Sequence, residues 1–219
     1  MALVKLLEAL GRLPAEIWLL PPIVILATVT AIGLMLRSSR LRRFRAIADR
    51  TGLEVKAKIF DASEVRGTFR GRALVMTTAS SRRPTWRKTW TLVTVDVKNP
   101  EFITLHLDHQ DVMDTLLASV GMSDIRIGDE AFDKQFVIRS NEPDLVKQLF
   151  QSAELREGLL RAGVDRVDLI GSKLHAYYTR EERDPEHAEL FFTAVTRLAE
   201  GIDALEHDDV PEIIRVDRR

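Results

Sequence analysis

The chain contains no cysteine among its 219 residues. It therefore cannot form disulfides, use a thiolate nucleophile or bind a metal through cysteine. Its formal net charge is −1, so it lacks the basic surplus that favours nucleic acid binding. Its glycines also form no glycine-rich loop of the kind that precedes a helix and cradles nucleotide phosphates. These absences count against nucleic-acid-binding proteins and several common enzyme classes.

One uninterrupted apolar run occupies residues 17–36. About 20 helical residues, rising ~1.5 Å each, span the hydrocarbon core of a bilayer. No acidic, basic or amide side chain interrupts this run. A secretory signal places its positive charge before a shorter apolar stretch, whereas here the arginines follow it. We therefore expect a retained transmembrane helix at residues 17–36, preceded by an external or interfacial segment at residues 1–16.

The charges that flank this run predict its orientation. Lys5 and Arg12 precede it, and five arginines follow within the next nine residues, in a predicted basic juxtamembrane helix at residues 37–52. Because the side richer in Lys and Arg tends to stay in the cytoplasm, we expect a single-pass protein of a bacterial inner membrane, with its N-terminus outside. The residues expected at the membrane interface, in contact with lipids, are Trp18, Arg37, Arg40, Arg42, Arg43 and Arg45.

Two prolines leave two chain paths open near the start of the run. Proline inside a helix removes a backbone donor and clashes with the preceding turn. Either one kinked helix begins near Ala15 and passes through Pro21 and Pro22, or residues 2–20 form a separate interfacial helix. In the second path Pro22 opens the spanning helix at its first turn, where proline is tolerated.

The residues after the anchor predict one cytoplasmic α+β domain with a mainly antiparallel sheet, at residues 53–205, and a charged tail at 206–219. Period-two alternation and turn residues predict a meander of five strands, at residues 53–59, 65–69, 73–77, 86–97 and 102–107. Glycine at position 52 is expected to end the juxtamembrane helix.

Shorter mixed units follow the meander. We expect helices at residues 111–120 and 143–150, a strand at 136–139, and a final hairpin of residues 166–170 and 174–178 around Gly171. A last helix is capped by Asp184 with Pro185 at its first position. Its apolar seam packs either on the domain's own sheet, which we favour, or against a coiled-coil partner. The seam comprises Ala188, Phe191, Val195, Leu198, Ile202 and Leu205.

Residues 125–180 show an acidic turn with Phe132 and Asp133, a short strand, a helix, a leucine-rich helix and a final hairpin. This order resembles that of an uncharacterised family of prokaryotic membrane-anchored proteins. The resemblance implies membrane anchoring. It implies no enzymatic activity, cofactor or site residue.

No combination of residues predicts a catalytic, cofactor-binding or metal site. His106, Asp108, His109 and Asp111 form the most compact group of potential metal ligands, but histidines three apart on a strand fall on opposite faces of the pleat. Glu130 and Asp133 could act as an acid and a base, although a solvated turn explains them better. His175 and His187 are expected to be structural or solvated.

A basic and aromatic cluster at residues 82–90 is the strongest binding signal. If Val93 and Val95 face the core, Trp90 and Leu92 lie on the other face of the sheet. Two tryptophans among cations could stack nucleic acid bases, lie in lipid headgroups or form the centre of a protein interface. Alternatively, helices cover both faces and the indoles belong to the core. The candidate partner-binding residues are Arg82, Arg83, Trp86, Arg87 and Trp90.

These observations predict a non-catalytic accessory or scaffolding subunit of a larger membrane complex, such as a respiratory or photosynthetic assembly. Its expected partners are membrane lipids and other membrane protein subunits, with no nucleic acid. The alternative is a membrane-tethered domain that binds or senses lipids. An enzyme ranks third.

Overall fold

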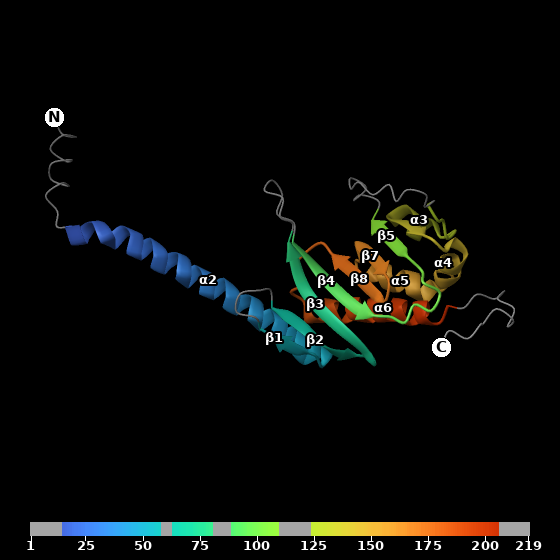
Figure 1. The fold of residues 1–219 in the computed structure, drawn as a ribbon, viewed down its shortest axis with the longest axis horizontal. Helices are drawn as coiled ribbons and strands as arrows, with labels where there is room; N and C mark the ends of the chain where they lie inside the picture. Colours follow the sequence, from blue (N-terminus) through green and yellow to red (C-terminus); the bar gives the residue numbers. More distant parts are fainter. Residues whose placement is uncertain (1–14, 58–62, 81–88, 110–123, 206–219) are drawn as a thin grey trace, which may run out of the picture. The chain divides into compact units, whose positions relative to one another are not determined.

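The computed structural model describes residues 15–57, 63–80, 89–109 and 124–205 (Figure 1). The chain divides at Arg42 into two units, residues 1–42 and 43–219. The described elements confirm an α+β fold. In chain order they are α2 (Ala15–Thr51), β1 (Glu54–Lys56), β2 (Glu64–Phe69), β3 (Arg72–Ser80), β4 (Thr89–Asp96), β5 (Leu105–His109), α3 (Glu130–Gln135), β6 (Phe136–Ser140), α4 (Pro143–Leu149), α5 (Ala153–Arg161), β7 (Arg166–Ile170), β8 (Lys173–Tyr178) and α6 (Pro185–Asp203).

Helix α2 begins at Ala15 and continues through both prolines to Thr51. It therefore follows the first of the two predicted paths over its described length. Gly52 has φ +70°, a left-handed conformation that glycine adopts without steric cost, so the helix ends where the sequence predicts.

Apolar side chains of the first unit project from α2 without cover. Val24, Ile25, Leu26, Val29 and Met35 are between 60% and 72% exposed. Nevertheless, within the part of the chain that the structure describes, no helix is both long and apolar enough to cross a membrane. The predicted span at residues 17–36 therefore stays a prediction from the sequence.

The last turns of α2 belong to the second unit and supply part of its core. Phe44, Ile47 and Ala48 are buried. Arg50 Nε donates to Glu189 Oε2 of α6 at 2.7 Å, and Arg43 lies 3.5 Å from Glu181. The predicted membrane-interface residue Arg43 thus forms an ion pair within the folded unit.

The second unit contains one eight-stranded sheet in the order β1-β2-β3-β4-β8-β7-β5-β6, and all its described pairings are antiparallel. The meander prediction is confirmed for β1 to β4 and wrong for the fifth strand. β5 pairs with β7 and β6, because the final hairpin β7–β8 inserts between β4 and β5. Local alternation of residues does not encode such a pairing between distant strands.

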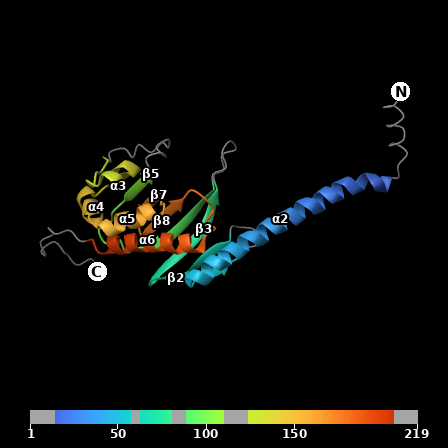
Figure 2. The ribbon, with the colours of Figure 1, turned by 180° about the vertical axis from the view of Figure 1, so that it is seen from behind.

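Helices cover one face of this sheet. α6 contacts β4, α5 contacts α6, and α3 and α4 contact β6; Figure 2 shows α6 running across the strands. All six predicted seam residues of α6 are buried. The seam therefore packs in the domain's own core, as we favoured from the sequence.

The predicted acidic turn at residues 129–133 is instead the start of helix α3. Asp129 caps it by accepting from the Phe132 backbone N–H at 3.2 Å. Asp133 accepts from the backbone N–H groups of Ile127 and Gly128, both at 2.9 Å. Asp129 and Asp133 thus hold backbone donors at the start of the helix.

Candidate functional site

The second face of the sheet, which we call the open face, carries partly exposed side chains at alternate positions of its strands. Along β4, Thr91, Val93 and Val95 are buried, whereas Trp90 and Leu92 are only partly buried. The predicted two faces of this strand are thus confirmed. The buried positions of β4 share a core cluster with residues of α6, so the opposite, partly exposed face is the natural place to look for a site.

Cross-strand pairing assembles a polar row on the open face. Asp168 of β7 pairs with His175 of β8 on one side and with His106 of β5 on the other. In antiparallel pairs, directly opposed residues point to the same face. Arg166 and Asp108 form the next row in the same way. We call His106, Asp108, Arg166 and Asp168 the ionic cluster.

Asp168 is the centre of this cluster and is only 3% exposed. Arg166 donates to both of its oxygens, from Nε at 2.8 Å and from Nη2 at 3.1 Å. His106 Nδ1 lies 2.9 Å from Asp168 Oδ1. Because an ionised carboxylate only accepts hydrogen bonds, Nδ1 of His106 carries the proton in this contact. A buried carboxylate is thereby paired on both oxygens.

The surroundings of the cluster shift its titration. Burial raises the pKa of the Asp108 carboxyl, against the opposing attraction of Arg166 at 3.5 Å. Burial opposes the charge on Arg166, but Asp168 and Asp108 together raise the pKa of its guanidinium. Burial also raises the pKa of Tyr177, whose ring centroid lies 5.6 Å from the Arg166 guanidinium carbon.

The raised pKa of Asp108 predicts the direction in which pH changes the effect of replacing this residue. Asp108 holds its proton more tightly in the folded state than in the unfolded state. The folded state therefore loses stability as pH rises from below 3.8, the ordinary pKa, through the raised pKa of the folded state. Asp108→Asn removes that cost. We expect its stability relative to the natural chain to be more favourable at about pH 7 than at about pH 3, measured by urea denaturation.

Asp144→Asn controls for the loss of one negative charge, because the Asp144 side chain is 99% exposed. A stability difference for Asp108→Asn that stays constant between the two pH values would contradict the role assigned to burial.

Several cations of the open face are paired with acids. Arg166 pairs with Asp168, and the closest N–O distances of three further pairs run from 2.6 to 3.9 Å. These pairs are Arg66–Glu64, Arg139–Asp124 and Lys173–Asp96. No group of three or more potential ligands that could hold a metal occurs among the described residues. The arrangement suits recognition of a mixed polar surface better than binding of a highly charged ligand.

An apolar strip borders the ionic cluster on the same face. Leu92 lies between Thr77 of β3 and Tyr177 of β8, and Trp90 lies opposite Ala79. Trp90 is the described member of the predicted partner-binding set. Arg82, Arg83, Trp86 and Arg87 lie outside the described residues.

The two histidines of the predicted group of potential metal ligands lie on opposite faces of the sheet, as expected. His106 lies on the open face, whereas His109 lies on the helix-covered face, with its ring 6.0 Å from that of Phe136. Asp111 lies outside the described residues. His175 Nδ1 lies 3.0 Å from Thr94 Oγ1, and His187 Nδ1 lies 2.5 Å from Glu182 Oε2. Both are held by neighbouring side chains, in agreement with a structural role.

The predicted membrane-interface residues lie in α2. Arg40, Arg42 and Arg45 are exposed. The side chains of Trp18 and Arg37 lie outside the described part of the structure.

The chain matches no family model and no curated protein. Its fold does match a solved structure, the mycobacterial trehalose monomycolate transport factor A, with a TM-score of 0.53 and 12% sequence identity. The match covers 78% of this chain and 97% of the other chain. The two proteins share a fold. At this identity the likeness extends to the architecture alone.

Sequence reasoning missed the ionic cluster as a unit. Along each of these strands, polar and apolar residues alternate. The polar residues stand at positions 106 and 108, 166 and 168, and 175 and 177, so each pair lies on one face of its strand. This alternation was the signal from which polar faces could have been predicted. Only the strand order β8-β7-β5 brings the three pairs together.

Proposed function

We propose that this chain is a non-catalytic accessory subunit of a membrane-associated transport assembly, and that it binds a protein partner through the open face. The observation that carries this proposal is the contrast between the two faces of one sheet. Helices cover one face, while the other face carries the partly exposed Trp90 and Leu92 and the ionic cluster, whose charges are paired. Aromatic side chains with arginines around them are typical of interface centres.

The shared fold supports a transport role over a respiratory or photosynthetic one. The structural neighbour is a transport factor, and the match spans nearly all of that chain. The apolar run at residues 17–36 and the arginines after it support membrane attachment, with the sheet domain on the cytoplasmic side. These two lines of support are independent of each other.

Membrane lipids alone are the second candidate occupant of the open face. A surface that binds anionic headgroups gains about 1 kcal/mol for each unpaired Lys or Arg near the bilayer. Four open-face cations are instead paired with carboxylates. This pairing favours a protein partner.

The test is extraction of the native membrane in a gentle detergent, followed by size separation and mass spectrometry. We expect the natural chain to migrate with a defined assembly. The variant carrying Trp86→Ala and Trp90→Ala should remain folded but lose about tenfold or more of this co-purification. Arg161→Ala, an exposed change on α5, should keep it.

Migration of the natural chain alone, at its own mass of 24.9 kDa, would contradict the accessory role. Loss of binding to anionic vesicles when residues 43–219 carry both tryptophan substitutions, with co-purification of the full chain unchanged, would favour the lipid candidate instead.

A further inference from the structure

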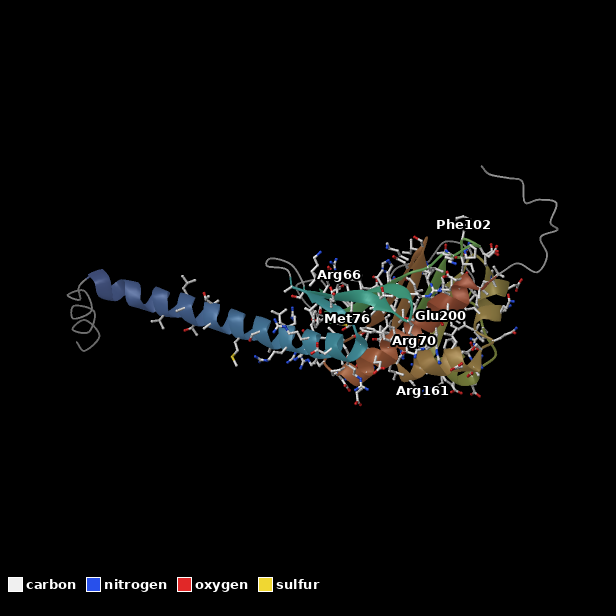
Figure 3. The ribbon with its side chains drawn as sticks, turned by 90° about the horizontal axis from the view of Figure 1, so that it is seen from below. Arg66, Arg70, Met76, Phe102, Arg161 and Glu200 are labelled. Atoms are coloured by element: carbon white, nitrogen blue, oxygen red, sulfur yellow. The ribbon has the colours of Figure 1, made fainter. Side chains whose placement is uncertain are left out.

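Phe102 occupies an unfavourable position on two counts. It is 83% exposed, compared with 60% for Ile170 and 37% for Leu190, the other large apolar side chains of the second unit that are described as exposed. Its φ of +51° lies in the left-handed region, which bulky residues rarely adopt. Figure 3 shows Phe102 pointing away from the sheet and helices. Neither feature stabilises the fold.

The turn that presents Phe102 is held rigidly. The backbone N–H of Phe102 donates to Asn99 O at 3.1 Å, which closes a β-turn. β-Turns favour glycine at the fourth position, which Phe102 occupies. Asn99 Nδ2 donates to Ile103 O at 2.9 Å, and Asn141 Nδ2 donates to Phe102 O at 3.3 Å. The ring is thus presented by a backbone that needs little further ordering on binding, which reduces the entropy cost of association.

Ile170 lies at the same end of the sheet. Asn99 Nδ2 also donates at 2.8 Å to the carbonyl oxygen of Gly171, the residue that follows Ile170. The side chain bonds of Asn99 therefore link the Phe102 turn to the β7–β8 turn. Two exposed apolar side chains, one of them aromatic, are fixed to a common frame.

From this strained and exposed presentation we infer that Phe102, together with Ile170 of the linked turn, is an anchor that inserts into an apolar pocket of a protein partner. Backbone strain that persists where it does not help folding is a reason to look for a function. Aromatic anchors buried in a partner's pocket are the usual centres of protein interfaces. This contact is separate from Trp90, and it rests on the proposed accessory role for the existence of a partner.

The surroundings favour a protein over the other occupants. Lys98, Glu101 and the Lys173–Asp96 pair place both signs of charge near the anchor, whereas an anionic bilayer favours cations. A second copy of this chain would need an apolar pocket. Two surface pockets of the described residues, one around residues 179–184 and the other around Arg72, Lys98, Glu200 and Asp203, contain charged side chains that an entering apolar ring would desolvate.

The test places a photoreactive amino acid at position 170 of the full chain in its native membrane, with and without Phe102→Asn. We expect irradiation to give one protein adduct, and Phe102→Asn to reduce it about tenfold or more. Asparagine tolerates positive φ, so this variant should melt at the same temperature as the natural chain or higher. Phe102→Leu, which keeps an apolar side chain, should retain most of the adduct.

A lipid adduct, an adduct to a second copy, no adduct, or an adduct unaffected by Phe102→Asn would each overturn the anchor. These results are read in the membrane before extraction. They are therefore distinct from failure of the accessory role, which appears as migration of the natural chain alone after detergent extraction.

Discussion

Replacing Arg166 by alanine is expected to lower the free energy of unfolding by about 3 kcal/mol, because it leaves the buried Asp168 carboxylate without its two-point partner. Arg166 donates two hydrogen bonds to this carboxylate, and Asp168 is 3% exposed. Of its two described side-chain partners, only His106 then remains. Urea denaturation of the purified full chain measures the loss.

The matched control is Arg139→Ala, on the same face of the sheet. Arg139 pairs with Asp124, whose side chain is 60% exposed, so its loss should cost less than about 1 kcal/mol. Adding Asp168→Asn to Arg166→Ala removes the stranded charge and should recover part of the loss. Equal effects of the two arginine substitutions would mean that burial of Asp168 does not decide the energetics.

Replacing Asn99 by alanine is expected to lower the free energy of unfolding by about 3 kcal/mol as well. The Asn99 side chain is 3% exposed and donates to the carbonyl oxygens of Ile103 and Gly171. It also accepts from the Ile103 backbone N–H at 2.9 Å. Alanine leaves these buried groups unpaired, and the φ of +48° at this position disfavours a residue with an ordinary Cβ.

Two variants separate these causes. Asn99→Gly keeps the backbone conformation and loses the side-chain bonds, whereas Asn99→Asp keeps the acceptor and loses the two donations. If Asn99→Gly were as stable as the natural chain, backbone strain would account for the whole effect of alanine, and the hydrogen-bond explanation would be wrong.

Strong local patterns predicted the elements well. Asp184 and Pro185 marked the start of α6, Gly52 marked the end of α2, and alternation in β4 separated Trp90 from the core. Each depends on a few neighbouring residues, whose capping, dihedral preference or period is visible in the sequence. The turn at residues 99–102 misled the prediction, because Phe102 was taken as the start of a strand that begins at Leu105.

The candidate site was less predictable than the fold. Trp90 was identified from the basic residues near it in the sequence and from its position on the face of β4 opposite the core. The ionic cluster was not, since its four residues come from two strands about sixty positions apart. The left-handed conformation of Phe102 was also invisible, because phenylalanine carries no signal for it.

By itself, the sequence determined the absence of thiol chemistry, the end of α2 and the start of α6, the alternation of the strands and the apolar run that predicts a membrane anchor. These properties follow from composition and from contacts between near neighbours. Only the tertiary structure decided the strand order, the burial of Asp168 and the exposure of Phe102. The first two depend on where the β7–β8 hairpin inserts, and that choice rests on burying apolar side chains from the whole domain at once.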